Sequence, residues 1–124
     1  MSDTYTETRL IKPETRQTVF KRDGLECHYC GCELIPEAVN QYSPAAIKAA
    51  ERLGIPRRGK WVKKVNYHRA IIEHIVPHVL GGESDIDNFV ACCAWDNANR
   101  GHGDYEEYRQ DVRDMLDAGD HPCM

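Results

Sequence analysis

Helix formers, helix caps and apolar spacing predict helices in three parts of the chain. The segment from Pro13 to Arg22 holds good helix formers between a proline and Asp23-Gly24, which predicts a first helix. A serine cap, a proline and a closing glycine predict a second helix over Ser43–Gly54. A last helix from about Asp104 to Ala118 is expected to serve packing, with its apolar side chains at Tyr105, Tyr108, Val112, Met115 and Leu116.

The middle of the chain predicts an antiparallel hairpin. Tyr67–His74 becomes apolar and β-branched toward its end, which indicates a strand that delivers Glu73 and His74 to a loop. Pro77 and Gly81-Gly82 end regular pairing and favour a turn. Asn88–Cys92 then fits the partner strand, and we expect Asp96 to cap a short helix that stops before Gly101.

Six cysteines lie in two short segments and near the last residue: Cys27, Cys30, Cys32, Cys92, Cys93 and Cys123. In a reducing compartment, closely spaced cysteines more often bind a metal than form disulfides. The stretch 25–34 predicts two short strands joined by a tight turn, with Cys27 and Cys30 directed toward one point. Two thiolates at this spacing can occupy two corners of a zinc tetrahedron. The sequence therefore predicts a zinc knuckle.

Charge is distributed unevenly along the chain. The net charge of −4 argues against a general nucleic-acid coat, but residues 52–72 contain no acid and seven basic residues. A basic stretch beside a metal site suits a polyanionic substrate, although a solvated loop is an alternative interpretation. Trp61, within this stretch, either stacks on a base or sugar or pins the loop to the core.

The length of 124 residues indicates one domain over residues 1–124, with an insertion at about 36–69. No apolar run approaches the roughly 18 to 20 residues needed to cross a membrane, and no basic segment followed by an apolar one marks the start. We therefore expect a cytoplasmic protein.

Together these motifs resemble HNH endonucleases. The resemblance rests on 16–24, Cys27-x-x-Cys30-Gly31, Glu73-His74-Ile75-Val76-Pro77, Gly81-Gly82, Asn88 and Cys93-x-x-Asp96-Asn97-x-x-Arg100-Gly101. It implies an α+β fold with a ββα-metal core of the His-Me finger type, a zinc knuckle, flanking helices and the basic helical insertion.

The resemblance also implies roles for four residues. His74 would be the general base, and Asn88 would brace the loop and orient His74. Glu73, in place of the usual aspartate, and Asn97 would bind the catalytic cation, Mg²⁺ or else Mn²⁺ or Ni²⁺. A neutral imidazole suits proton abstraction near pH 7, and oxygen ligands suit such a cation.

The structural zinc site departs from the usual two Cys-x-x-Cys pairs, because the second pair reads Cys93-Ala94-Trp95-Asp96. We expect Cys27, Cys30, Cys93 and Asp96 as the ligands. Cys32, His121 or Cys123 could supply the fourth ligand instead while Asp96 only caps the helix, or the site no longer holds zinc.

The implied function is metal-dependent hydrolysis of DNA phosphodiester bonds, by nicking or double-strand cutting. Double-stranded DNA would be held by Arg57, Arg58, Lys60, Lys63 and Lys64, while His102, and less clearly His78, would reach the scissile phosphate. The small size resembles phage nucleases, which implies a bacterial or phage-infected cell and a terminase as a candidate partner. The alternative is a non-catalytic zinc-knuckle module that binds nucleic acid or protein.

Overall fold

The computed structural model describes residues 11–36, 38–40, 43–77, 81–82 and 86–124. Its elements, in chain order, are α2 (Pro13–Asp23), α3 (Pro44–Leu53), α4 (Trp61–Asn66), β1 (Ala70–His74), the 3-10 helix η2 (Ile86–Asn88), β2 (Phe89–Cys93), α5 (Ala94–Arg100) and α6 (Tyr105–Ala118). The three helices predicted from the sequence are confirmed as α2, α3 and α6, and each ends at a left-handed glycine.

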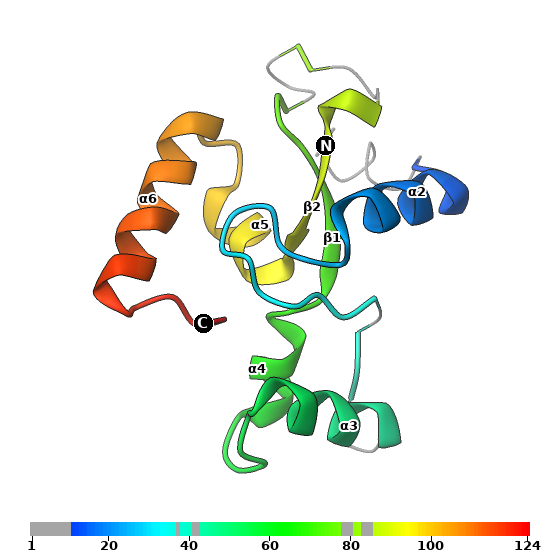
Figure 1. The fold of residues 1–124 in the computed structure, drawn as a ribbon, viewed down its shortest axis with the longest axis vertical. Helices are drawn as coiled ribbons and strands as arrows, with labels where there is room; N and C mark the ends of the chain where they lie inside the picture. The colour runs from blue at the N-terminus through cyan, green and yellow to red at the C-terminus, as the bar shows by residue number, and fades with distance from the viewer. Residues whose placement is uncertain (1–10, 37, 41–42, 78–80, 83–85) are drawn as a thin grey trace.

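The hairpin of β1 and β2 occupies the middle of the molecule, with α2 on one side and α5 and α6 on the other (Figure 1). Its antiparallel register runs from Ala70 opposite Cys93 to His74 opposite Phe89. Every residue of β2 is buried. The main hydrophobic core joins the hairpin to Val19 of α2 and to Tyr108 and Val112 of α6.

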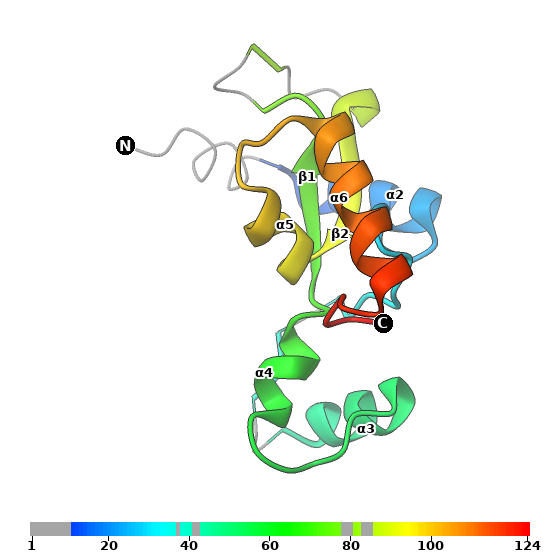
Figure 2. The same ribbon diagram turned by 90° about the vertical axis from the view of Figure 1, so that its left-hand side faces the viewer.

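Helices α3 and α4 form an arm beyond the end of the hairpin where β1 begins (Figure 2). A small second hydrophobic cluster holds these two helices together. It consists of Ile35, Ala49, Ala50 and Val65, and Trp61 packs against it. Trp61 therefore attaches its own segment to this cluster. Of the two roles expected for Trp61, the structure shows the packing role.

Two of the predicted strand regions cover more of the chain than the observed strand pairing does. The stretch 25–34 forms only an isolated bridge between Glu26 and Glu33, because Cys27 and Cys32 turn the chain back within six residues. The strand expected from Tyr67 begins at Ala70, because the backbone N–H groups of Tyr67 and His68 still bond to carbonyls of α4.

Asp96 is not the cap of α5. The helix begins earlier, at Ala94, and its N-cap is Cys93, whose sulfur accepts the Asp96 N–H at 3.3 Å. Asp96 lies in the first turn, where a carboxylate faces the positive end of the helix. None of the helices that the structure describes is long and apolar enough to cross a membrane.

Polar contacts attach α2 to the second strand. Arg22 donates from Nη2 to the Phe89 carbonyl at 2.6 Å and from Nη1 to the Ile86 carbonyl at 3.0 Å. Asp23 Oδ2 accepts the Ala91 N–H at 2.9 Å. Burial alone would raise the pKa of Asp23, but the hydrogen bonds from Arg22 and Ala91 outweigh it and hold the pKa below its ordinary value.

We predict that Asp23→Ala lowers the free energy of unfolding by about 1 to 3 kcal/mol, because the Ala91 N–H and Arg22 lose their acceptor. Since the folded pKa is depressed, the contribution of Asp23 is present at neutral pH and is lost as the pH falls through the folded pKa. Urea unfolding at pH 7 and at about pH 3 checks this. The control is Asp111→Ala, on the exposed face of α6; an equal effect of both variants at pH 7 would contradict the assignment.

Candidate functional site

Glu73 joins β1 to α5. Its side chain is 6% exposed, and Oε1 accepts from Asn97 Nδ2 at 3.3 Å. Oε2 accepts from the Tyr29 hydroxyl and from Arg100 Nη1, the latter at 3.0 Å. The structure therefore brings together two of the predicted cation ligands, Glu73 and Asn97.

Arg100 is the last residue of α5, and its guanidinium is 1% exposed. Besides the bonds to Glu73 and Tyr29, it donates to the carbonyls of His74 at 2.9 Å and Ile75 at 2.5 Å, and from Nε to the Gly103 carbonyl at 2.9 Å. One buried cation thus fixes the end of β1, the knuckle and the end of α5 together.

The pKa values of Glu73, Arg100 and Tyr29 depend on one another. Burial raises the pKa of Glu73, while Tyr29, Arg100 and Asn97 oppose that rise. Burial alone would lower the pKa of Arg100, but the charges of Glu73 and Tyr29 and the hydrogen bonds to both residues together outweigh it and raise the pKa. Burial and the neighbouring Glu73 both raise the pKa of Tyr29, so the phenol stays a donor.

His74 is the last residue of β1 and is 6% exposed. Its ring lies edge-on to Phe89, its partner in the register, with the centroids 4.8 Å apart. The Arg100 bond to the His74 carbonyl fixes the backbone from which the imidazole projects.

Asn88 closes the base of the loop after β1. Its Oδ1 accepts the Val76 N–H at 2.9 Å, its Nδ2 donates to the Val76 carbonyl at 3.0 Å, and its own carbonyl accepts the Ile75 N–H at 2.8 Å. This pairing holds the chain directly after His74. His78, the remaining histidine of the loop, lies outside the described residues.

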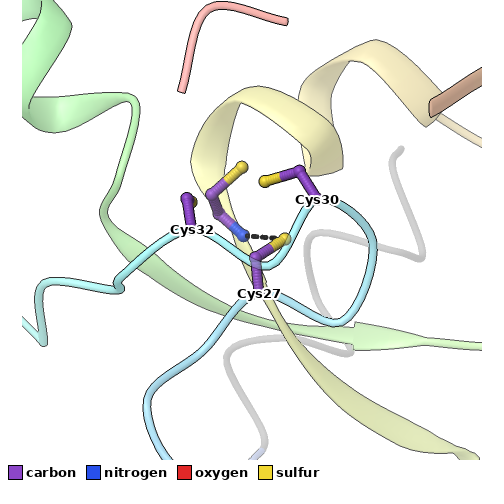
Figure 3. A group of neighbouring side chains, drawn as sticks. Cys27, Cys30 and Cys32 are labelled. Carbon is purple, nitrogen blue, oxygen red and sulfur yellow. Dashed lines mark hydrogen bonds between the residues drawn. The ribbon is translucent and has the colours of Figure 1, made fainter. Parts of the chain in front are cut away.

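A cysteine cluster lies at the other end of the hairpin. Ligand atoms of Cys27, Cys30, Cys32 and Cys93 all lie within 4.8 Å of one another, and all four residues are buried. Figure 3 shows Cys27, Cys30 and Cys32 along one tight loop. The backbone N–H of Cys93 donates to Cys27 Sγ at 3.3 Å. Such N–H···S bonds stabilise thiolates, the form that binds zinc.

Asp96 lies beside this cluster and is fully buried. Its Oδ2 is 3.3 Å from Cys27 Sγ and 3.2 Å from Cys93 Sγ. Its Oδ1 accepts from the Tyr108 hydroxyl at 2.7 Å and from His121 Nε2 at 2.8 Å. Burial raises the pKa of Asp96, and the hydrogen bond from His121 opposes the rise. The predicted zinc residues are thus gathered, but Cys32 completes a group of four sulfurs without Asp96.

The predicted DNA-binding residues do not gather at Glu73. They are exposed residues of the arm, in the segment before α4 and on α4 itself: Arg57, Arg58, Lys60, Lys63 and Lys64. The arm lies at the start of β1, whereas Glu73 and His74 end that strand (Figure 2). His102 is exposed and follows α5, two residues after Arg100.

Residues 60–103, which include α4, the hairpin and α5, match the family model described as HNH endonuclease. This segment is therefore similar to HNH endonucleases. No curated protein and no solved structure matches the chain.

The HNH match agrees with the observed order of two antiparallel strands and a helix, which is the ββα-metal fold within an α+β protein. It begins at residue 60, so residues 60–69 of the expected insertion lie in the HNH segment. Helix α2, the Cys27–Cys32 loop and α6 lie outside it. These outer parts supply Tyr29 to Glu73 and Tyr108 to Asp96.

Two site residues were not assigned a role from the sequence. Arg100 stands three residues after Asn97, and a charged residue at the end of a short helix beside a glycine could have drawn attention. Tyr29 lies between Cys27 and Cys30 and donates to Glu73, which is 44 residues away in the sequence. No local sequence pattern indicates a contact over that separation.

We predict that Arg100→Ala lowers the free energy of unfolding by about 3 to 5 kcal/mol, because it leaves Glu73 as a buried charge without its cation. The double variant Arg100→Ala/Glu73→Gln should be more stable than Arg100→Ala, since the buried charge is gone. Arg109→Ala, which breaks an exposed pair with Glu106, should cost at most about 1 kcal/mol. Urea unfolding measures all three; a double variant no more stable than the single one would argue against the ion pair as the cause.

Proposed function

We propose that the protein is a metal-dependent DNA endonuclease that hydrolyses phosphodiester bonds. The observation that carries the proposal is the contact between Glu73 and Asn97, which joins the end of β1 to α5 inside the segment that matches the HNH family. A carboxylate and an amide meet there beside a histidine that ends the same strand.

His74 acts as the general base in this proposal. A neutral imidazole can take a proton from water near pH 7 and so produce the nucleophile for in-line attack on phosphorus. Arg100 and Asn88 fix the backbone at His74 and directly after it, through the carbonyl of His74 and both backbone groups of Val76. Positioning of this kind supplies much of the advantage of a bound reactant.

The donor set fits a hard divalent cation. Glu73 Oε1 and the amide oxygen of Asn97 would hold it, since Oε2 is engaged by Tyr29 and Arg100. Two oxygen ligands leave further positions to water and phosphate, as Mg²⁺ prefers, and Mn²⁺ or Ni²⁺ accept similar ligands. When bound, such a cation neutralises charge on the leaving 3′ oxygen. The expected products carry a 5′-phosphate and a 3′-hydroxyl.

The basic arm is the proposed holder of double-stranded DNA. Its lysines and arginines are exposed, and no acidic residue lies between Arg52 and Ile72. Contacts of this type bind phosphates without reading bases, so we expect weak sequence preference. His102, exposed after α5, is the proposed contact closer to the cleaved bond.

A structural zinc ion would hold the knuckle against β2. Cys27, Cys30 and Cys93 are the proposed ligands, with Cys32 fourth because the four sulfurs lie together. Asp96 remains the alternative fourth ligand through Oδ2. A cytoplasmic site of action and a terminase partner stay predictions from the resemblance.

We predict that the purified protein nicks supercoiled plasmid with Mg²⁺, Mn²⁺ or Ni²⁺, and that His74→Ala lowers the rate by about 10²- to 10⁴-fold because the general base is lost. Asn97→Ala should raise the metal concentration needed for half-maximal rate, because one oxygen ligand is removed. Gel assays of nicked product against time measure both effects.

The matched control is Val76→Ala, whose side chain is 45% exposed and lies two residues after His74. It should nick at the rate of the wild type. Equal rates for wild type and His74→Ala, or no nicking with any of the three metals, would leave the non-catalytic zinc-knuckle module as the better interpretation.

We predict that Lys63→Ala/Lys64→Ala weakens DNA binding and lowers the slope of log affinity against log salt by about 1 for each phosphate that the variant no longer binds. Fluorescence anisotropy of labelled duplex DNA, over several salt concentrations and without added divalent cation, measures the slope. Lys12→Ala/Lys21→Ala removes the same charge from exposed positions at α2. An equal change in both pairs would mean that net charge, and not the arm, governs binding.

A further inference from the structure

A second group of metal-type side chains meets beside the four cysteines. Cys32, His68 and Cys123 place one ligand atom each within 4.8 Å of the others, and all three residues are buried. They come from the knuckle loop, the turn after α4 and the segment after α6. Packing alone seldom gathers two thiols and an imidazole from three distant parts of a chain.

The imidazole of His68 is prepared for metal binding. Its Nδ1 lies 2.9 Å from the Glu33 carbonyl oxygen, which can only accept, so Nδ1 carries the hydrogen. The neutral ring then presents its lone pair at Nε2. A histidine held by a backbone carbonyl at one nitrogen while it binds a metal through the other is a recurring arrangement in metalloproteins.

The segment that carries Cys123 is anchored. The Cys123 N–H donates to His121 Nδ1 at 3.1 Å, and His121 Nε2 bonds to Asp96 Oδ1 at 2.8 Å. His121 therefore uses both ring nitrogens to hold the segment, which leaves Cys123 as its ligand. Cys123 Sγ lies 3.9 Å from Cys93 Sγ, close to the separation of two sulfurs on one zinc ion.

We propose that the protein binds a second zinc ion through Cys32, His68 and Cys123, with Cys93 as the fourth ligand. Cys32 belongs to both groups, so its sulfur, and that of Cys93, would bridge the two ions. A thiolate has lone pairs enough to bind two cations. The six side chains then form one dinuclear site with two terminal ligands on each ion.

Charge balance favours the second ion. Four thiolates around one zinc ion leave a net charge of about −2, whereas five thiolates and a neutral imidazole around two ions leave about −1. A buried net charge is costly to remove from water. The alternative is that Cys123 is only a small apolar residue that fills space.

Metal counting tests the proposal on the full chain, purified in a reducing buffer that contains zinc. Native mass spectrometry and elemental analysis should find two zinc ions per wild-type chain. Cys123→Ser and His68→Ala should each retain one. Metal–metal scattering in the zinc X-ray absorption spectrum of the wild type should confirm the bridge.

Controls separate loss of a ligand from loss of the fold. Cys92→Ala removes a buried cysteine that belongs to neither group and should keep two ions, as should His102→Ala. A wild-type chain that holds one zinc ion, or a Cys123→Ser variant that still holds two, overturns the proposal. Because the wild-type count needs no variant, misfolding of a variant cannot hide the answer, and plasmid nicking tests the nuclease separately.

Discussion

The buried guanidinium of Arg100 is the interaction on which the candidate site depends. It bonds Glu73, Tyr29 and the backbone carbonyls of His74, Ile75 and Gly103. It is the one residue among these contacts that fixes both the Glu73 carboxylate, together with Tyr29, and the exit of the chain from β1, together with Asn88. A hairpin of five-residue strands is too short to hold these positions by its own ladder.

The same ion pair limits what Glu73 can do. Oε2 serves Arg100 and Tyr29, so the proposed cation would bind Oε1, which also accepts from Asn97 Nδ2 at 3.3 Å. Arg100 also places a positive charge beside that position, which weakens the attraction for a divalent ion. The guanidinium is 1% exposed, so it cannot itself reach a phosphate. The proposed cation would therefore be held loosely by the protein, with water and substrate as its further ligands.

Local sequence patterns were sufficient for the helices and the hairpin, because caps, turn residues and apolar spacing act over a few positions. The predicted helix at 43–54 is present almost to the residue, with its Ser43 cap and left-handed Gly54. Such patterns failed to predict elements that are held by contacts between residues far apart in the sequence. Helix α4 was missed since its basic residues have no amphipathic pattern and its order comes from Trp61 and Val65 packing on α3.

The site divides in the same way. Glu73, His74 and Asn97 were named from the resemblance, and the structure joins Glu73 to Asn97. Tyr29 and His68 were not named as site residues, because each meets its partner through a fold that local spacing does not describe. The cysteine cluster had a partial signal: the Cys-x-x-Cys pair was recognisable and Cys32, His121 and Cys123 were candidates for a fourth ligand, but only the fold shows which of them lie together.

The separation of the basic arm from His74 constrains how the proposed substrate would lie. From Ala70 to His74 the strand rises about 3.3 Å per residue, or about 13 Å in all. Successive base pairs of duplex DNA are about 3.4 Å apart. If the proposed duplex ran parallel to the hairpin, it would need at least about four base pairs between its contact with Lys63 or Lys64 and the bond cut beside His74. The arm would then act on DNA affinity and register, while the chemistry depends on the far end of the strand.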